Sequence, residues 1–175
     1  MMSGPGALVD AILAAHAAEL GADRLAYRNH VRRVLRFFER LAGAAPSHVV
    51  VAAAFHDLGI WVDRTFDYLG PSVRLARAYA EATEFEPFAA EIEATILNHH
   101  KLTPYEGPFS GSVETFRKAD LVDVSLGLIR FGIPRADVRA TRAALPNAGF
   151  HRRLVALTGR QLVRTPWRPL PMVRW

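Results

Sequence analysis

Six ionisable residues have the types and spacing that could support metal chemistry: His30, His56, Asp57, His99, His100 and Asp120. His56 and Asp57 are adjacent in the stretch "AAAFHDLGIW", directly after an almost unbroken apolar run. A buried carboxylate without a partner costs on the order of several kcal/mol. A divalent cation held by imidazoles and carboxylates offsets that cost. The pattern therefore indicates a buried metal site.

Helices must carry these residues into the interior. An apolar face at helical spacing predicts a helix over 24–41, with His30 on that face and arginines opposite; the face comprises Tyr27, Val31, Val34, Leu35, Phe38 and Leu41. Ser47 is expected to cap a helix through "VVVAAAF", which is apolar all round, as in the central helix of a bundle. The "VVV" run leaves a short strand as an alternative, although its length and alanine content favour helix.

Proline, glycine and polar residues between the other apolar segments predict more helices joined by loops, without a convincing strand or internal repeat. On the helix with Asp120, Ser112 is the expected cap, and the inward face comprises Val113, Phe116, Asp120, Val124 and Leu128. Pro71 and Ser72 are the start signals of an earlier helix, and one or two weaker helices follow Pro134. The expected helices cover 8–20, 73–82, 87–101 and 113–129, and the longer loops cover 59–72 and 102–112.

We expect one all-α domain over residues 1–163, followed by an extended tail at 164–175 that is too rich in proline to be helical. A chain of 175 residues, of which 50% are hydrophobic, can bury a substantial core. The tail is expected to lie across the domain with Trp167 and Trp175 partly buried, and a disordered tail is the alternative.

The composition excludes some kinds of site and indicates which partners and location to expect. The chain has no cysteine, which excludes disulfides, thiolate zinc sites and cysteine nucleophiles. Its net charge of +5 comes from 20 Arg and 2 Lys against 17 acidic residues, and the arginines are scattered. Basic residues do not cluster with aromatic residues outside the tail, so nucleic acid is not an expected partner. Without a signal peptide or a run of about 20 apolar residues, we expect a cytoplasmic protein without a membrane partner.

The order His30, then His56 and Asp57, then Asp120 resembles the H…HD…D signature of the HD-domain superfamily of metal-dependent phosphohydrolases. The stretches "FHDLGIW" and "RKADLVD" match the usual settings of that signature, and the resemblance spans about residues 24–130. It implies an HD-domain helical bundle in which these four residues bind the metal. Asp57 is then the carboxylate able to bridge to a second ion.

The resemblance implies one divalent ion, of manganese, iron, nickel, cobalt or zinc. The doublet "NHH" is similar to the paired histidines of dinuclear members, so His99 and His100 are the expected ligands of a second ion, if one binds. Those members usually supply a further histidine between the HD pair and the doublet. This chain has none between Asp57 and His99, which favours a single ion.

The activity that the resemblance implies is hydrolysis of a small phosphoester, such as a nucleotide, by metal-activated water. Asp57 and Asp120 are the expected catalytic carboxylates, and His99 or His100 then contacts substrate or donates a proton. Asp123 is expected to accept a hydrogen bond from a ligand histidine. The expected substrate-binding residues are Arg64, Tyr68, Lys101 and Arg117, with Asp63 and Asp67 as further candidates at the pocket rim.

The same scaffold also carries diiron oxygenases and a zinc-dependent hydratase that acts on cyanamide, and both stay open as alternatives. A binding module without turnover ranks below catalysis, because all four ligands of the signature are present. The sequence is compatible with a homo-oligomer. It does not identify the substrate. His16, His48 and His151 lack this context and are expected to be structural or surface residues.

Overall fold

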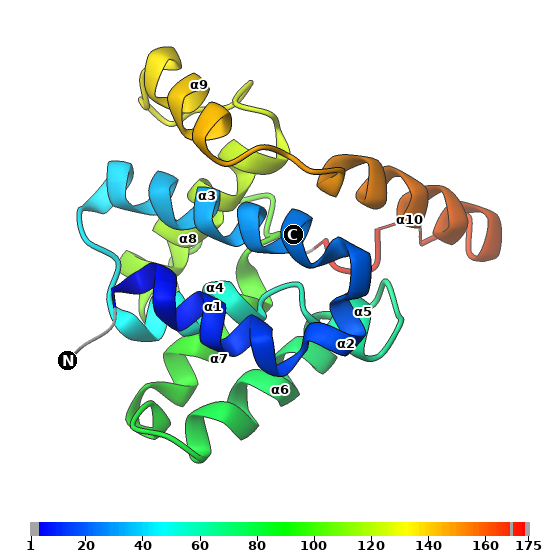
Figure 1. Cartoon of the computed structure of the whole chain (residues 1–175), viewed down its shortest axis with the longest axis horizontal. Helices are drawn as coiled ribbons and strands as arrows, with labels where there is room; N and C mark the ends of the chain where they lie inside the picture. The colour runs from blue at the N-terminus through cyan, green and yellow to red at the C-terminus, as the bar shows by residue number, and fades with distance from the viewer. Residues whose placement is uncertain (1–3, 169, 174–175) are drawn as a thin grey trace.

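The computed structural model describes residues 4–168 and 170–173, and within these ranges the chain is helical without a β-strand. The predicted all-α bundle is therefore confirmed (Figure 1). No helix in these ranges combines the length and the apolar character that crossing a bilayer requires. The helices are α1 (Pro5–Ala15), α2 (Ala17–Leu20), η1 (Gly21–Asp23), α3 (Arg24–Ala42), α4 (Ser47–Phe55), α5 (Gly59–Val62), α6 (Leu69–Glu81), η2 (Glu86–Phe88), α7 (Ala89–Asn98), α8 (Ser110–Val124), α9 (Arg135–Ala144) and α10 (Phe150–Arg164).

Helix α4 is the central element of the bundle, as its all-round apolar sequence predicts. It contacts α1, α3, α6 and α7, and every side chain from Val49 to Phe55 is buried. The helical alternative for "VVV" is confirmed and the strand alternative is wrong. Three successive alanines, Ala52–Ala54, let the neighbouring helices approach closely, because they add little volume.

Helices α3 and α8 pack side by side across the bundle. Five of the six predicted apolar residues of α3 are buried, and Leu41 is half-buried. The expectation that the arginines of α3 all face away from the core is wrong at one position. Arg33 is fully buried, because its charge is balanced by an aspartate of α8.

The predicted serine caps are wrong. Ser47 is the first residue of α4 and makes no capping hydrogen bond. Helix α8 begins at Ser110, and the Ser112 hydroxyl donates to the Phe109 carbonyl instead of capping a backbone N–H. Helix α6 begins at Leu69, before the predicted start signals, and the Ser72 hydroxyl accepts a hydrogen bond from the Gly59 N–H at 3.0 Å. At Ser72, a contact with another segment therefore takes up a hydroxyl that the local sequence assigns to a helix start.

Several predicted boundaries differ from the structure, among them that of the helix expected over 87–101, which covers Ala89–Asn98. The helix expected over 8–20 is interrupted at His16, and the loop expected over 59–72 contains α5. The helix expected over 113–129 ends at Val124, so that Leu128, predicted to face inward, is 86% exposed. A left-handed residue, Gly127 with φ +81°, follows this end, and its N–H bonds to the Val122 carbonyl at 2.8 Å. This hydrogen bond satisfies a terminal carbonyl and stops the helix.

The C-terminal region contains two helices after Pro134, as predicted, and both lie at the periphery (Figure 1). The expected partial burial of Trp167 is wrong, since this side chain is 82% exposed. Met172 is instead buried and belongs to the core, so the described part of the tail does reach the domain. The prediction for Trp175 lies outside the described residues.

Candidate metal centre

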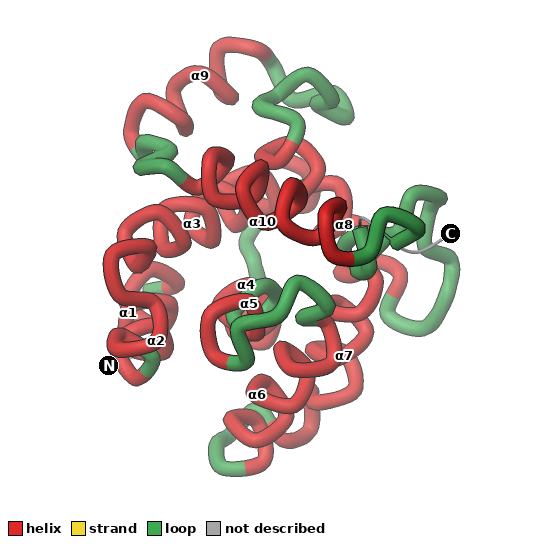
Figure 2. Tube along the Cα trace, turned by 90° about the vertical axis from the view of Figure 1, so that its right-hand side faces the viewer, coloured by secondary structure: helices red, strands yellow, loops and turns green. Residues whose placement is uncertain are grey.

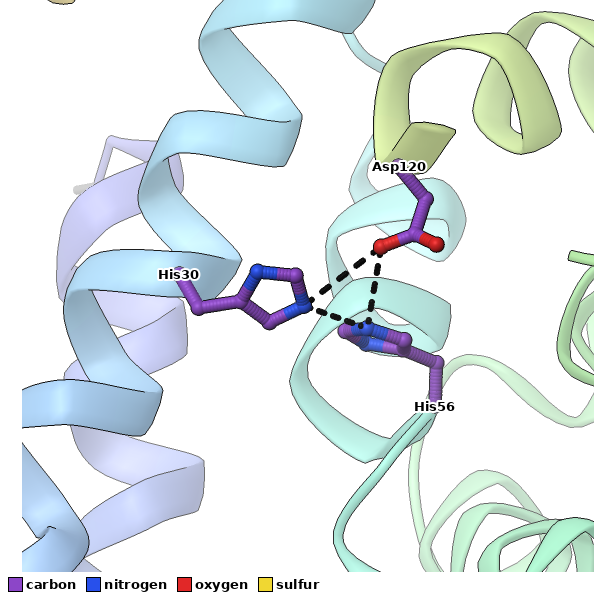
Figure 3. Close-up of side chains that lie close together, drawn as sticks. All are labelled: His30, His56 and Asp120. Atoms are coloured by element: carbon purple, nitrogen blue, oxygen red, sulfur yellow. Dashed lines mark hydrogen bonds and ion pairs between the residues drawn. The ribbon is translucent and has the colours of Figure 1, made fainter. Parts of the chain in front are cut away.

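Four segments of the bundle deliver the six residues to one place. His30 comes from α3, Asp120 from α8, and His56 with Asp57 from the turn that follows α4. Figure 3 shows the side chains of His30, His56 and Asp120 pointing toward one another. The doublet His99–His100 directly follows α7 and completes the group. We call these six residues the His/Asp cluster; all are buried except His100, whose side chain is 22% exposed.

Four atoms of the His/Asp cluster converge as metal ligands do. The Nε2 atoms of His30 and His56 are 3.0 Å apart, and Asp120 Oδ1 lies 3.5 and 3.8 Å from them. Asp57 Oδ2 lies 3.6 Å from His30 Nε2 and 3.4 Å from His56 Nε2. Ligand atoms about 2.0–2.2 Å from a shared ion lie roughly 3 to 3.5 Å from one another. Both carboxylates therefore lie within reach of an ion held by the two imidazoles, and His30, His56 and Asp120 together form one group of donors that could hold a metal.

Both carboxylates also turn their second oxygen toward the histidine doublet. Asp57 Oδ1 lies 3.4 Å from His99 Nε2, and Asp120 Oδ2 lies 3.9 Å from His100 Nδ1. Asp57 and Asp120 thus stand between two pairs of imidazoles, with one oxygen facing each pair. Two groups of donors can be drawn on the second side, namely His56, Asp57 and His99, and His99, His100 and Asp120.

Hydrogen bonds on the outer side of three imidazoles leave their inner nitrogens free to bind a cation. The Nδ1 atom of His56 lies 2.7 Å from the Ala53 carbonyl, and that of His99 lies 2.7 Å from the Ile96 carbonyl. A carbonyl only accepts, so each Nδ1 carries the proton and each Nε2 presents a lone pair to the cluster. The Nδ1 atom of His30 lies 2.7 Å from Asp123 Oδ2, which favours the same tautomer.

Three buried polar atoms of the cluster have no hydrogen-bond partner. Among the residues that the structure describes, Asp57 Oδ1, Asp120 Oδ1 and His99 Nε2 are buried without a hydrogen-bond partner. Buried polar groups are nearly always paired, and an unpaired one is costly. Asp120 Oδ1 faces the His30–His56 pair, whereas Asp57 Oδ1 and His99 Nε2 face each other on the side of the doublet, so a cation on either side would satisfy the acceptors that lie there. The donor set therefore fits a divalent metal ion.

Comparisons of the chain with family models, with curated proteins and with solved structures gave no match. The assignment of these six residues as a candidate metal centre consequently rests on their own geometry. That geometry has three parts: convergence of donor atoms, matching tautomers and unsatisfied buried acceptors.

Burial and neighbouring charges set the protonation states of the cluster. Burial opposes protonation of His30, but the hydrogen bond to Asp123 and nearby carboxylates outweigh it and raise the pKa of His30 to about 9. Burial lowers the pKa of His56 to about 3 and raises that of the Asp120 carboxyl to about 6. Burial also opposes ionisation of Asp57, but the adjoining imidazoles outweigh it and hold its pKa well below the usual range. Near neutral pH and without a metal, His56 is therefore neutral, both carboxylates are ionised and His30 is protonated, so a metal that binds His30 must displace its proton.

Asp123 supports the cluster from outside, and its predicted contact with a ligand histidine is confirmed. Besides His30, it accepts two hydrogen bonds from Arg33, at 2.6 Å from Nε and 2.8 Å from Nη2. Both side chains are fully buried. The pKa of Asp123 is accordingly lowered: burial opposes its ionisation, but the His30 and Arg33 hydrogen bonds prevail. Arg33 was not predicted as a site residue, although it follows His30 by three residues and so lies near the same helix face.

Two other side chains near the cluster were not expected there. The ring of Phe150 stacks on His30 with centroids 4.0 Å apart. The Tyr27 hydroxyl donates to the Ala54 carbonyl at 3.0 Å and accepts from the Asp57 N–H at 3.2 Å. Tyr27 therefore fixes the end of α4 at the residue pair that carries the chemistry. Its place in the predicted apolar face of α3 shows that it points inward but not that its hydroxyl has partners there.

The predicted substrate-binding residues divide into two groups. Tyr68 is buried, and its hydroxyl lies 2.7 Å from His100 Nε2, so the structure brings it to the cluster. Arg117 pairs with both oxygens of Glu114 at 2.7 Å and donates to the Lys101 carbonyl at 3.0 Å. The Lys101 ammonium bonds to the Thr103 hydroxyl. Arg64 is exposed in a left-handed conformation with φ +53°.

The other candidates lie in ion pairs or structural contacts. Asp63 pairs with Arg74 at 2.7 Å, and Asp67 pairs with Arg168 at 3.5 Å. Of the histidines expected to be structural, His151 contacts the Asp123 carbonyl through Nε2 at 3.1 Å. Asp63 and Asp67 are therefore exposed residues in surface ion pairs, and His151 contacts the backbone beside the cluster.

Proposed function

We propose that this chain is a metal-dependent hydrolase of the HD-domain type, with His30, His56, Asp57 and Asp120 as ligands of one divalent ion. The observation that carries the proposal is that the Nε2 atoms of His30 and His56, 3.0 Å apart, each lie 3.4–3.8 Å from an oxygen of Asp57 and an oxygen of Asp120, although these residues come from three segments of the bundle. The order of these residues along the chain, which resembles the HD signature, gives the class of reaction. The proposed substrate is a small phosphoester.

The chain's own residues would divide the work as follows. A divalent ion in such a site supplies Lewis acidity and lowers the pKa of a water molecule towards neutrality. Asp120, which is ionised above a pKa of about 6, would orient that water through Oδ2. His100 is the most exposed member of the cluster and would meet the substrate first.

Tyr68 and His100 together offer a hydrogen-bond donor to the substrate. If the Tyr68 hydroxyl donates to His100 Nε2 across 2.7 Å, the proton of neutral His100 resides on Nδ1. Nδ1–H then faces the cluster, where it can donate to a phosphoryl oxygen. Burial lowers the pKa of His100 well below its usual value, which favours this neutral form. Lys101, whose carbonyl is held by Arg117, adds a positive charge next to the doublet.

A second candidate, a dinuclear centre, is favoured by one specific observation. The free oxygens of Asp57 and Asp120 face His99 and His100, so a second ion could be held on that side by two imidazoles and two carboxylates. In this case the Tyr68 hydroxyl accepts a hydrogen bond from His100 Nε2–H, and His100 Nδ1 carries the lone pair. Two irons in such a centre would correspond to the oxygenase alternative. The hydratase alternative stays a prediction.

Metal analysis of protein purified without added metal, combined with assays on a panel of phosphoesters, tests the proposal. We expect one ion per chain and phosphoester hydrolysis that is lost in His56→Ala but retained in His48→Ala. His48 is a suitable control because it lies outside the cluster, against Glu91 and Phe88. Two irons per chain with consumption of dioxygen would support the second candidate. Failure to bind any metal supplied in excess would exclude both.

A further inference from the structure

Charge is distributed very unevenly along the chain. Residues 125–168 contain nine arginines and one acidic residue, Asp137, a net charge of +8. Residues 1–124 contain twelve basic and sixteen acidic residues, a net charge of −4. The basic region comprises the loop after α8, the helices α9 and α10, and the start of the tail. These elements lie at the periphery of the bundle, with α10 along one side and α9 at another (Figure 1, Figure 2), and three of the nine arginines, Arg142, Arg153 and Arg168, pair with acidic residues of the rest of the chain.

The same region exposes the most accessible large apolar side chains of the described residues. They are Leu128 at 86%, Val163 at 85%, Trp167 at 82% and Val155 at 72% exposed. Val163 and Val155 lie on α10, and Leu128 and Trp167 lie in the segments on either side of the α9–α10 pair. Isolated exposed apolar residues are ordinary, but several in one basic region indicate a contact surface.

Helix α10 combines both features on its outer side, which faces the viewer in Figure 2. Among its residues, only Phe150 is fully buried. On a helix with about 100° per residue, the exposed residues Leu162, Val155, Val163 and Arg160 cover an arc of about 160°. Arg152 falls within that arc and is also exposed. We call these five residues the α10 outer face.

An apolar groove borders the α10 outer face. It lies between the end of α8 and α10 and is lined by Val124, Leu126, His151, Leu154, Val155, Thr158 and Gly159. Because Val155 belongs to both, the groove and the outer face form one continuous surface. On this surface Arg152 lies between Val155 and Val163, and Arg160 lies at the edge away from the groove.

We propose that the α10 outer face and Trp167 bind the surface of a membrane that contains anionic phospholipids. An amphipathic helix with arginines beside aliphatic residues can lie in the plane of the lipid headgroups without crossing the bilayer. The arginines then pair with lipid phosphates, to which guanidinium groups bind in bidentate fashion. The aliphatic side chains and Trp167 enter the boundary of the acyl chains. The expectation of no membrane partner was based on the lack of a spanning segment, which this mode of binding does not need.

The charge and the side-chain types select this occupant over others. A second copy of the chain on the same face would bring two regions of charge +8 together, which is unfavourable. Nucleic acid would satisfy the arginines and could stack on Trp167, but it gains little from exposed Val155, Leu162 and Val163, because single strands bind through stacking on aromatic residues. An anionic bilayer satisfies both the arginines and the aliphatic residues.

Sedimentation of the full metal-loaded chain with vesicles tests the proposal. We expect binding to phosphatidylcholine vesicles that contain phosphatidylglycerol, little binding to pure phosphatidylcholine, and weaker binding as salt increases. Arg152→Glu/Arg160→Glu should lower the affinity by at least about tenfold, since each basic residue near an anionic surface contributes appreciably. Leu162→Ser/Val163→Ser should also lower it, by about tenfold.

Matched variants elsewhere on the surface provide the controls. Arg24→Glu/Arg36→Glu changes the net charge equally on exposed positions of α3, and Leu25→Ser removes an exposed apolar side chain. Both should bind vesicles as the unmodified chain does. The proposal is overturned if the chain does not bind anionic vesicles at low salt, if the α10 variants bind like the controls, or if a single-stranded oligonucleotide binds while vesicles do not.

Discussion

The Nε2 atoms of His30 and His56 approach to 3.0 Å, although the two residues lie on α3 and at the end of α4 and are separated by 26 positions. Each imidazole is held from behind, His30 by Asp123 and His56 by the Ala53 carbonyl. Two imidazoles that present lone pairs to each other at this distance repel unless a proton or a cation lies between them. The prediction on removal of metal depends on this close approach of the two nitrogens.

Removal of metal should destabilise the protein. Chelation followed by dialysis is expected to lower the Tm by about 5 to 10 °C, since a ligand at a hundred times its Kd stabilises the native state by about 2.7 kcal/mol. Calorimetry of the metal-free and reloaded protein measures the difference. His56→Ala should show the low Tm in both conditions. Equal Tm values for the unmodified chain with and without metal would contradict a structural contribution of the ion.

Asp123→Asn should reduce both stability and metal affinity. The substitution leaves the buried Arg33 without its ionic partner, which is expected to cost about 3 to 5 kcal/mol in the free energy of unfolding. It also removes the acceptor that orients His30, which should weaken metal binding by about 10- to 100-fold. Urea unfolding and competition with a chromophoric chelator measure these two effects. Asp137→Asn, in a half-exposed pair with Arg40, is the control and should change neither by much.

Arg33 and Asp123 should behave as one energetic unit. Arg33→Leu alone leaves the Asp123 carboxylate buried with less compensation, so it is expected to destabilise about as strongly as Asp123→Asn. The double variant should therefore cost at least about 1 kcal/mol less than the sum of the single variants. A double-mutant cycle by urea unfolding measures this coupling. Additive effects would show that the two side chains do not depend on each other.

Tyr68→Phe should affect turnover and leave the metal in place. Loss of the hydroxyl removes the 2.7 Å hydrogen bond to His100 Nε2, so the imidazole loses its fixed orientation. We expect kcat on a phosphoester to fall by about 10- to 100-fold while the metal content stays at one ion per chain. Tyr79→Phe, whose ring packs against Phe55, is the matched control. If Tyr68→Phe instead loses metal, His100 is a ligand and not a substrate contact.

Acid should weaken the contact that anchors Lys101. Burial opposes ionisation of Glu114, but the hydrogen bonds from Arg117 outweigh it and lower the pKa of Glu114 from 4.5 to about 2. A lowered folded-state pKa contributes stability that is present above pH 4.5 and lost as the pH falls through about 2. Glu114→Gln should therefore cost about 1 to 2 kcal/mol at pH 6 and almost nothing near pH 2.

Urea unfolding of Glu114→Gln at several pH values follows this difference. Glu93→Gln, which changes an exposed pair with Arg77, serves as the control and should show little effect at any pH. A cost for Glu114→Gln that does not change between pH 6 and pH 2 would mean that the ion pair contributes nothing to stability.

Hydrophobic periodicity determined the helical class and the inward direction of most site residues. His30 shares a helix face with Tyr27 and Val34, and Asp120 shares one with Phe116, so each could be assigned to the interior from its own helix. Element boundaries were less accessible. Leu128 was assigned to a helix that stops at Val124, because a left-handed turn at Gly127 ends it.

The all-α bundle and the inward direction of the imidazoles and carboxylates could be predicted from the residue pattern. Which atoms meet became clear only from the packing of the helices. Asp57 and Asp120 each face two imidazole pairs. Tyr68 reaches His100, and Arg33 is buried against Asp123. The physical reason is that periodicity fixes the direction of a side chain only relative to its own helix axis. The partner across the core depends on how helices distant in sequence pack together.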